Sequence, residues 1–561
     1  MQPLMAGNLD SRESASGITR AEWRVIIAAS LGSVLELYDF QVVGLLTNEL
    51  AKTFFSGVNP TAAYVFTLLG FAAGFVLRPF GALVFGRIGD LLGRKRTFLV
   101  TIVLMGACTV GIGLIPGYAA IGIAAPILFI CMRLLQGLAL GGEFSGAMIY
   151  VAEHAPARAR GAWTSYIILT AALGLLLSFA VVLPLRILLG KEAFSAWGWR
   201  VPFLVSSVLL AISVWVRLKL NESPEFARMK EEGTLSKAPI AETFGQWKHL
   251  KLVVIAFFGI VAGQTVVWYT GQFYTIFFLT KVLKVEDASA NLLIIGATVA
   301  TVPLYLFFGW LSDRIGRKPV YLTGLLLAVL CFFPLFKMVN HYANPALERA
   351  QQLAPIFVVA DTSQCAVQFN PTGTASYSSS CDVVKARLAK AGLSYRMMPG
   401  LTGALAEVRI GEARIPGYNA FGPDAIEQSR LFESRLRAAL SQSGYSEGAA
   451  DPAAMNIPML LLLLILTMSF GTMTFATSSA MLVELFPSRI RYTAMSFPYH
   501  LGSAIFGGFM PATAFAIVAA TGDIFSGLRY PVMVAGVAFV VTFFFAKESR
   551  GKPITDGSLH G

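Results

Sequence analysis

Charged residues are scarce in this sequence of 561 residues: Asp, Glu, Lys and Arg make up 14% of it, while hydrophobic residues make up 55%. A soluble protein carries roughly 25% charged residues, so this composition excludes an ordinary soluble globular fold. Apolar runs long enough to cross roughly 30 Å of hydrocarbon recur along the chain. The sequence therefore predicts an all-α membrane protein, because backbone groups in lipid must form hydrogen bonds within their own segment.

Histidine and cysteine are rare too, with five of each. They form no cluster with the spacing of a metal site, and the sequence has neither a phosphate-binding glycine loop nor a catalytic-triad pattern. We therefore expect no enzyme, no ATP-driven pump, no cofactor and no bound metal. Cys108, Cys131 and Cys331 lie in apolar stretches, where we expect ordinary small apolar side chains.

Twelve apolar stretches predict twelve transmembrane helices in two halves of six. A polar segment between the sixth and seventh stretches separates the halves, which is typical of a transporter built from repeats. The predicted spans are residues 24–48, 62–86, 97–116, 120–150, 162–188, 200–219, 251–281, 289–311, 319–339, 455–483, 492–520 and 528–547.

The distribution of Lys and Arg predicts the orientation. These residues concentrate in the segments that lie inside if the N-terminus is inside, so the net charge of +12 reports topology, and we expect no nucleic-acid partner. We divide the chain into a cytoplasmic N-terminal tail (1–23), an N-terminal six-helix bundle (24–219), a central cytoplasmic loop (220–250), a C-terminal six-helix bundle (251–339 and 455–547), an insertion (340–454) and a cytoplasmic C-terminal tail (548–561).

The insertion, residues 340–454, is too polar and too long for an ordinary loop. Alternating apolar residues near Ile356 and helix-like stretches at 383–391 and 425–439 predict a small α+β extracytoplasmic domain between helices 9 and 10. Cys365 and Cys381 lie in it, and an oxidising compartment favours a disulfide worth about 3 kcal/mol; free thiols are the alternative. The sequence leaves open whether this domain binds substrate, recruits a partner or braces the outer mouth.

One pattern occurs twice, once in each half, between long apolar stretches. Its second glycine can take the positive φ of a tight reversal, and its cations stay at the anionic cytoplasmic surface. Its Asp stands at the end of a helix, where the helix dipole disfavours a negative charge. We therefore expect an Arg or another helix's N-terminus to compensate this charge, and the Asp to act as a latch. A solvated basic turn is the alternative for one copy alone. The two copies are Gly86, Asp90, Gly93, Arg94 and Lys95, and Gly309, Asp313, Gly316, Arg317 and Lys318.

These paired hairpins resemble the loop 2–3 and loop 8–9 motifs of the major facilitator superfamily. Other segments resemble its metabolite:proton symporter branch, whose members import osmolytes or organic acids such as alpha-ketoglutarate, citrate and shikimate. The likeness covers nearly every membrane segment but not the insertion. Its further segments are Leu35–Phe40, Arg78–Gly81, Arg133–Gly146, Glu153–Pro156, Arg160–Gly161, Trp199–Phe203, Glu222–Pro224, Glu484–Pro487 and Arg491–Tyr492.

Charges inside the bilayer should carry the chemistry, because a buried ion is costly and persists where it works or is paired. Glu36 and Asp39 lie midway along the first span on one helical face, and Arg133 lies near the middle of the fourth. The resemblance implies that the first, fourth, seventh and tenth spans surround a central cavity. We expect Arg133 to attract a substrate carboxylate and Glu36 or Asp39 to carry the coupling proton. A permanent structural ion pair is the alternative.

The remaining candidate residues follow from their depth in the spans. In the seventh span a polar and aromatic stripe is expected to face the substrate, with helix packing as the alternative. His500 stands where the family more often has Asn, and we do not assign it the proton. The further substrate candidates are Tyr38, Gln136, Gln264, Trp268, Tyr269 and Gln272. Residues nearer the cytoplasmic ends are assigned to the gate: Arg78, Glu143, Glu153, Arg160, Glu484 and Arg491.

Together these features predict a proton-coupled secondary active transporter, a symporter that imports a small polar metabolite by alternating access. An organic acid anion or a zwitterionic osmolyte is the expected substrate. The alternatives are a transporter-like sensor whose external domain binds a ligand, and uncoupled facilitated diffusion, against which the acidic pair in the first span argues. The expected partners are the substrate, the proton and the lipid bilayer. We expect a monomer in a bacterial inner membrane with both termini cytoplasmic.

Overall fold

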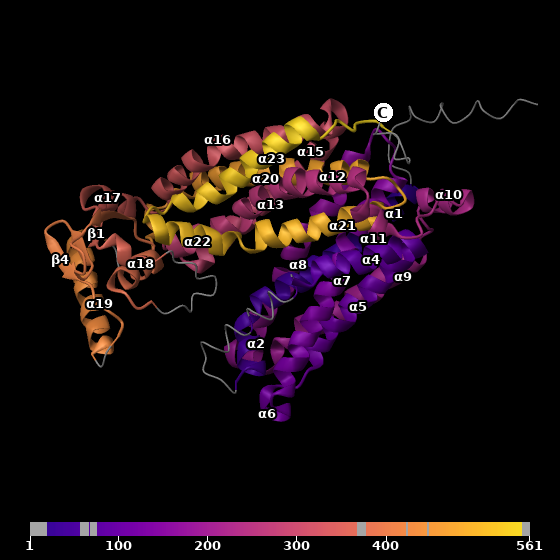
Figure 1. Ribbon diagram of the computed structural model, residues 1–561. Coiled ribbons are helices and arrows are strands. Elements are labelled where there is room, and N and C mark those ends of the chain that lie inside the picture. The colour runs from indigo at the N-terminus through magenta and orange to yellow at the C-terminus, as the bar shows by residue number, and fades with distance from the viewer. Residues whose placement is uncertain are drawn as a thin grey trace, which may run out of the picture.

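The computed structural model describes residues 20–56, 67, 74, 76–366, 377–421, 424–445 and 448–552. Long helices dominate it, and the two halves of the chain form two bundles set at an angle to each other (Figure 1). The helices of the N-terminal half are α1 (Arg20–Leu45), α2 (Thr47–Phe54), α4 (Arg78–Leu92), α5 (Arg94–Leu114), α6 (Tyr118–Ile121), α7 (Ala124–His154), α8 (Arg160–Ala193) and α9 (Arg200–Leu218).

Two short helices follow this half, α10 (Pro224–Glu232) and α11 (Pro239–Gly245). The helices of the C-terminal half are α12 (Trp247–Ile255), α13 (Ala262–Tyr269), α14 (Thr275–Phe277), α15 (Asp287–Ile315), α16 (Arg317–Ala343), α20 (Ile457–Leu485), α21 (Arg491–Gly502), α22 (Met510–Thr521) and α23 (Arg529–Phe545). Short π-helical segments join α12 to α13, α13 to α14, and α21 to α22, so that each series forms one helical rod.

Eleven helical stretches in the described part of the chain are long and apolar enough to cross a membrane. They coincide with eleven of the predicted spans. The first part of the remaining predicted span, 62–86, lies mostly outside the described residues, and α4 covers its second part. The two predicted tails also lie mostly outside them.

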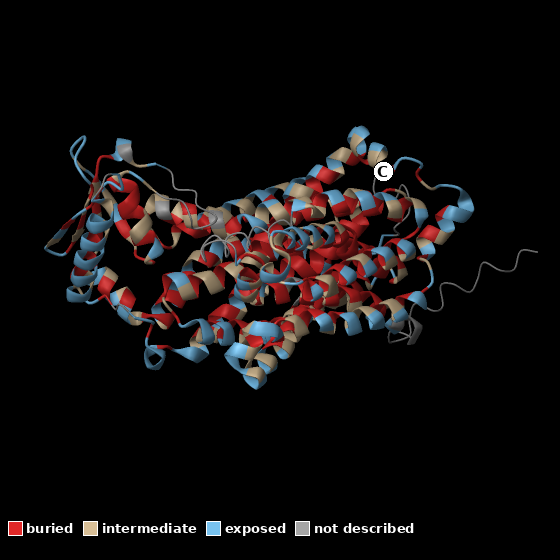
Figure 2. Ribbon diagram, turned by 90° about the horizontal axis from the view of Figure 1, so that it is seen from below, coloured by how far each residue is buried: buried red, intermediate tan, exposed pale blue. Residues whose placement is uncertain are grey.

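Apolar side chains cover the outside of the bundle as well as its interior. Leu188, Trp215 and Leu330 are between 60% and 81% exposed, while Figure 2 shows the buried residues gathered where the helices meet. A water-soluble protein rarely exposes so much contiguous apolar surface. This distribution fits helices that face lipid.

The two repeated hairpins have the same backbone conformation. Gly93, between α4 and α5, and Gly316, between α15 and α16, both have φ of +111°. A residue with a Cβ rarely adopts this conformation, which explains the glycine that ends each repeat's helix. The end of the molecule that carries these reversals is called the hairpin end below.

The described residues of the insertion form four strands and three α-helices. The strands form one sheet in the order β2-β1-β3-β4, in which β1 pairs parallel to β2 and antiparallel to β3. Alternate residues of β1 are buried, as the alternating sequence predicts. The elements are α17 (Pro345–Leu353), β1 (Ile356–Ala360), α18 (Ser380–Lys390), β2 (Tyr395–Pro399), β3 (Glu407–Ile410), β4 (Ala413–Pro416) and α19 (Ala425–Gln442).

A disulfide joins Cys365 to Cys381, at the start of α18. Backbone hydrogen bonds tie the insertion to the C-terminal half: the Tyr395 amide donates to the Gly522 carbonyl (2.7 Å), and the Ala450 amide donates to the Lys284 carbonyl (2.8 Å). Figure 1 shows the insertion at the far end of α16, α22 and α23, opposite α10. We call this the insertion end. The halves converge toward α10 and α11, and separate toward α2 and α6 on one side and the insertion on the other.

Candidate functional site: a charged cavity between two halves

A cavity of about 90 Å³ lies between the two halves. It is formed by side chains of α1, α4 and α7 from the N-terminal half and of α13, α20, α21 and the π-helical segments after α13 and α21 from the C-terminal half. A rearrangement of one half against the other would therefore change its walls. The lining residues are Glu36, Leu37, Gln41, Arg78, Phe144, Gln264, Thr265, Trp268, Tyr269, Phe273, Phe475, Tyr499, His500 and Ser503.

One acid and one strong base face this cavity. Glu36 comes from the middle of α1 and is 5% exposed, and Arg78 is the first residue of α4. A cavity with one carboxylate and one guanidinium can bind a positive and a negative group of one small molecule at the same time.

Aromatic rings form much of the remaining wall. The ring of Trp268 lies 5.3 Å from that of Tyr269 and 5.6 Å from that of Phe475, measured between centroids. Phe144 and Tyr499, from opposite halves, stack at 5.4 Å. Such ring faces attract an organic cation through their electron-rich π systems.

Two polar side chains of the cavity are held by serines. The Ser478 hydroxyl donates to the Gln264 amide oxygen, and Ser145 and His500 are hydrogen-bonded at 3.4 Å between Oγ and Nε2. His500, which the sequence singled out only as a departure from its family, therefore contacts α7 from α21. This contact spans the two halves.

Asp39 belongs to a different site, buried inside the N-terminal half. Its carboxylate accepts hydrogen bonds from the Thr109 hydroxyl (2.6 Å) and the Ser206 hydroxyl (2.7 Å). Gln136 donates to Thr109 (2.5 Å), and Arg133 donates to Gln136 (2.7 Å). A chain of hydrogen bonds thus links Asp39 on α1 to Arg133 on α7.

The predicted convergence of Glu36, Asp39 and Arg133 on one cavity is wrong. Residues three apart on a helix point about 60° away from each other, and here that angle turns Glu36 to the cavity and Asp39 toward α5 and α9. Arg133 is 3% exposed, and a Cβ added to Gly74 would come within 3.3 Å of its Nη2. Neither Asp39 nor Arg133 lines the cavity.

The residues predicted to bind substrate also lie in different places. Gln264, Trp268 and Tyr269 line the cavity, as expected of a stripe on the seventh span. Gln272 lines an adjoining cavity. The Tyr38 hydroxyl donates to the Pro202 carbonyl (2.8 Å) and is fully buried away from both, and Gln136 is part of the Asp39 network.

Several lining residues gave no signal in the sequence, and one was assigned elsewhere. Arg78 was placed at the gate because its span was counted from hydropathy alone, yet it lies on the cavity wall. The others are neutral side chains of apolar spans, where an inward-facing residue looks like a lipid-facing one. These are Leu37, Gln41, Phe144, Thr265, Phe273, Phe475, Tyr499 and Ser503.

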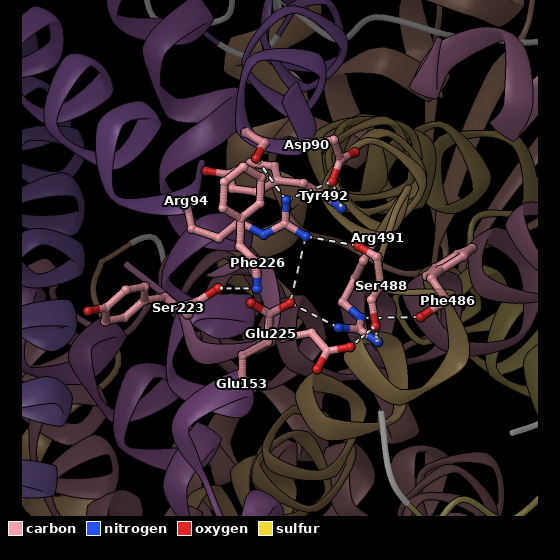
Figure 3. A network of polar contacts seen from close by, with 12 residues as sticks. Asp90, Arg94, Glu153, Ser223, Glu225, Phe226, Phe486, Ser488, Arg491 and Tyr492 are labelled. Atoms are coloured by element: carbon pink, nitrogen blue, oxygen red, sulfur yellow. Dashed lines mark hydrogen bonds and ion pairs between the residues drawn. The ribbon is translucent and has the colours of Figure 1, made fainter. Parts of the chain in front are cut away.

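At the hairpin end, charges join the two halves (Figure 3). Asp90 of α4 accepts hydrogen bonds from the backbone amides of Tyr492 (3.2 Å) and Thr493 (2.9 Å), in the first turn of α21. Arg94 donates to the same carboxylate (3.0 Å) and to the Ser488 carbonyl (2.9 Å). Asp90 therefore caps a helix of the opposite half, where the positive end of its dipole favours an anion.

The second copy of the motif makes the reciprocal contact. Asp313 of α15 accepts from the amides of Gly161 (2.9 Å) and Ala162 (2.7 Å), in the first turn of α8, and from Arg317 (2.5 Å). Each half therefore caps one helix of the other. The two forms of compensation that the sequence required, a neighbouring Arg and another helix's N-terminus, are both present at both copies.

Two further buried ion pairs, Arg491–Glu153 and Arg160–Glu484, cross the same seam, and in each the carboxylate also faces an Arg of its own half. Arg491 donates to Glu153 (2.9 Å), and Arg94 lies 3.7 Å from that carboxylate. In the second copy, Glu484 lies 3.5 Å from Arg160 and 3.4 Å from Arg317.

A carboxylate also caps the helix that follows each reversal. Glu222 accepts from the amides of Arg94 (2.9 Å) and Lys95 (3.1 Å), while Glu548 accepts from those of Arg317 (3.0 Å) and Lys318 (2.9 Å). These caps stay within one half. The sequence gave no role to Glu548.

The remaining gate candidates have separate surroundings. Glu143 forms an ion pair with Arg217 and accepts from Thr101 (2.7 Å), all within the N-terminal half. Gly86 and Gly309 lie where the halves touch: a Cβ on Gly86 would come within 2.8 Å of the Thr493 Cα, and one on Gly309 within 2.6 Å of the Gly161 carbonyl. Glycine allows these close approaches. Among the residues that the structure describes, no group of three or more His, Cys, Asp or Glu is placed to hold a metal.

Comparison with known families gives one match. Residues 25–360 match the family model described as "Sugar (and other) transporter". Among solved structures, the fold is similar to that of the proton:xylose symporter XylE bound to 6-bromo-6-deoxy-D-glucose, with a TM-score of 0.61 over 96% of this chain and 98% of that one at 16% identity. A double tryptophan mutant of XylE gives a TM-score of 0.64 at 15% identity, over 95% and 97% of the two chains.

Three curated relatives show closer sequence similarity. The proline/betaine transporter of Salmonella typhimurium is 34% identical over 324 residues, covering 56% of this chain and 65% of that protein. The shikimate transporter of Escherichia coli is 33% identical over 58% of this chain and 74% of its own length. The inner membrane metabolite transport protein YhjE of the same species is 34% identical over 62% of this chain and 79% of its own length. The match thus spans just under two thirds of the proline/betaine transporter.

Proposed function

Because the chain belongs to the sugar (and other) transporter family of the major facilitator superfamily, we propose that it is a proton-coupled symporter for a small zwitterion. The resemblance to the superfamily and its metabolite:proton symporter branch, first drawn from motifs, is confirmed by these relatives. Transport by alternating access, the coupling ion and the substrate are the parts that we propose.

The observation that carries the proposal is that Glu36 and Arg78 both line the charged cavity. An organic dianion would meet one cation and one repelling carboxylate there. A zwitterion satisfies both charges, with its carboxylate at Arg78 and its cationic nitrogen between Glu36 and the rings of Trp268 and Phe475. Of the two substrate classes that the sequence left open, the geometry favours the zwitterionic osmolyte. This proposal assigns the anion-binding role to Arg78 instead of Arg133.

Two acids are available for proton coupling, at different places. In our proposal Glu36 contacts the substrate, and Asp39 binds the coupling proton. The effect of that proton reaches α7 through the chain of hydrogen bonds formed by Thr109, Gln136 and Arg133. Loss of charge at Asp39 would release its hydrogen bonds with α5 and α9. The N-terminal half could then change its internal packing when a proton binds.

The seam at the hairpin end supplies the gate. The described contacts hold the halves together there, while the ribbons diverge toward the insertion end. We propose that this is the outward-facing state of a twelve-helix transporter, with both termini and residues 220–250 in the cytoplasm and the insertion outside. In the inward-facing state, the Asp90 and Asp313 caps must break. We further propose a monomer in a bacterial inner membrane, with the domain boundaries given by the sequence.

Uptake into proteoliposomes tests the function. Purified protein is given radiolabelled glycine betaine, proline or shikimate, with and without an inward proton gradient. We expect the gradient to drive accumulation of a zwitterion, and Asp39→Asn and Glu36→Gln to abolish accumulation while Asp39→Asn still exchanges substrate. Glu49→Gln, in a partly exposed ion pair with Arg186, is the matched control and should behave like the wild type. Binding without accumulation would contradict symport and favour the sensor alternative.

A further inference from the structure

A second cavity adjoins the charged one and has a different chemistry. It measures about 180 Å³, twice the volume of the first. Gln41, Trp268 and Phe273 line both, so the two cavities share a wall. None of the described residues that line the second cavity is charged, and most are aliphatic or aromatic.

The second cavity lies toward the insertion end of the molecule. On α1 its lining begins at Gln41 and reaches Leu45, the last residue of the helix, which places it about 7 Å or more along the helix axis from Glu36. On α8 it follows Ala172 to Phe179, or about 10 Å of helix. It is therefore elongated and lies on the side from which a substrate enters an outward-facing transporter.

Trp268 is fixed at the boundary between the cavities. Its indole nitrogen donates to the Tyr305 hydroxyl (2.9 Å), and Tyr305 lines the second cavity. The few polar groups beyond Trp268 are amides and hydroxyls. Thr298 donates to the Gln272 amide oxygen (3.4 Å), so these two are partly satisfied by each other. An apolar cavity with a few neutral polar groups suits the uncharged part of a ligand.

We infer that the two cavities are one binding site for a zwitterion that carries an apolar extension, with its charged head between Glu36 and Arg78 and its extension beyond Trp268. This inference rests on the proposed function and narrows its substrate class. A compact zwitterion such as glycine betaine fills only the charged cavity. A longer one also removes its apolar surface from water in the second cavity, which stabilises the complex.

The test uses a series of N-alkyl-N,N-dimethylglycines with methyl, butyl, hexyl and octyl groups, which vary the extension while keeping the head constant. Their affinities are measured on the purified full-length protein by competition with radiolabelled glycine betaine. We expect affinity to rise with alkyl length by up to about fourfold per methylene, the transfer value for a buried CH₂. The rise should end when the cavity is full.

A variant separates the second cavity from the first. Ala172 is buried on α8 and lines only the second cavity, so Ala172→Phe should fill it, abolish the gain from the alkyl chain, and leave glycine betaine affinity within about twofold of the wild type. Ala180→Phe, at an exposed position of the same helix, is the matched control and should keep the gain.

The outcomes distinguish the two proposals. Affinity that is constant or falls with alkyl length in the wild type overturns the inference while leaving a zwitterion symporter intact. The same holds if Ala172→Phe retains the full gain. Absence of binding for every member, the methyl compound included, overturns the proposed function and the inference together.

Discussion

Asp90→Asn is the sharpest test of the reciprocal helix caps. Asp90 is fully buried, and its two oxygens accept from three groups of α21, the amides of Tyr492 and Thr493 and the Thr493 hydroxyl, as well as from Arg94. Asparagine keeps the shape but has one acceptor oxygen, and its NH₂ group faces donors. The variant therefore weakens the contact between the halves without leaving a cavity.

The magnitude follows from the contacts that are lost. A hydrogen bond to a charged group contributes about 1.5–3 kcal/mol, and an anion at a helix N-terminus about 0.3–1 kcal/mol. Arg94 keeps its bonds to the Gly89 and Ser488 carbonyls, which limits the loss. A net change of about 2–3 kcal/mol shifts the equilibrium between outward-facing and inward-facing states about 30- to 140-fold, since 1.4 kcal/mol is tenfold.

Spin labels report this shift directly. Ala120 on α6 and Ala288 on α15 are exposed, one in each half, on the two sides where the halves diverge away from the hairpin end. Ala120→Cys and Ala288→Cys carry the labels in a protein in which Cys108, Cys131 and Cys331 are replaced and the disulfide is kept. We expect a shorter distance population to appear in Asp90→Asn, because closing the insertion end accompanies opening of the hairpin end. Asp313→Asn should do the same.

The experiment has a matched control variant and an outcome that would refute the reasoning. Glu49→Gln changes a carboxylate to an amide in a pair that lies within the N-terminal half, and should leave the distances unchanged. If Asp90→Asn is folded and its distance distribution equals that of the wild type, the caps do not hold the outward-facing state. The seam would then be permanent packing.

Three further outcomes are expected. Arg78→Lys should raise the KM for a zwitterion at least tenfold in the uptake assay, because an ammonium cannot bind a carboxylate in the bidentate way of a guanidinium. Arg133→Lys should lower the transport rate with little change in KM. Equal effects of the two variants on KM would refute the assignment of Arg78 to the cavity and Arg133 to the Asp39 network. Gly86→Ala should destabilise the outward-facing state by about 1–3 kcal/mol in the spin-label assay, since its Cβ would meet the Thr493 backbone, while Gly44→Ala, with nothing within 4 Å, should not. Replacing Cys365 and Cys381 by Ser should destabilise the insertion by about 3 kcal/mol. Protease added outside right-side-out vesicles should then cleave the insertion faster than in the wild type and in the control variant Cys131→Ser. An unchanged cleavage rate would argue against an extracytoplasmic, disulfide-stabilised domain.

The helical spans could be predicted to within a few residues because the determinant is local. An apolar run of about 20 residues has one stable conformation in lipid, whatever it packs against. The α15 and α16 helices begin and end within four residues of the predicted spans 289–311 and 319–339. The reversal at Gly316 could be predicted for the same reason, since a positive φ depends on a single residue. β1 of the insertion follows from a two-residue alternation.

The cavity could not be predicted in the same way. Hydropathy gives the depth of Arg78 and Arg133 in the membrane but not the direction in which each side chain points. Both are arginines in apolar surroundings, yet one lies on the cavity wall and the other is linked by Gln136 to the Asp39 network. The small rotation between Glu36 and Asp39 on α1 separates two acids that the sequence placed together. Only packing against α5, α9 and the opposite half decided these directions.

The sequence by itself determined that this protein is a duplicated helical membrane protein with an inserted α+β unit, because hydropathy, glycine reversals and strand alternation act over short distances. It also showed that Asp90 and Asp313 each need a compensating partner. The tertiary structure decided which partners those are, since the amides that Asp90 binds lie about 400 residues away in the chain. It likewise decided which acid and which base share a cavity. Electrostatic pairing depends on distance in space, and the sequence fixes that distance only through the whole fold.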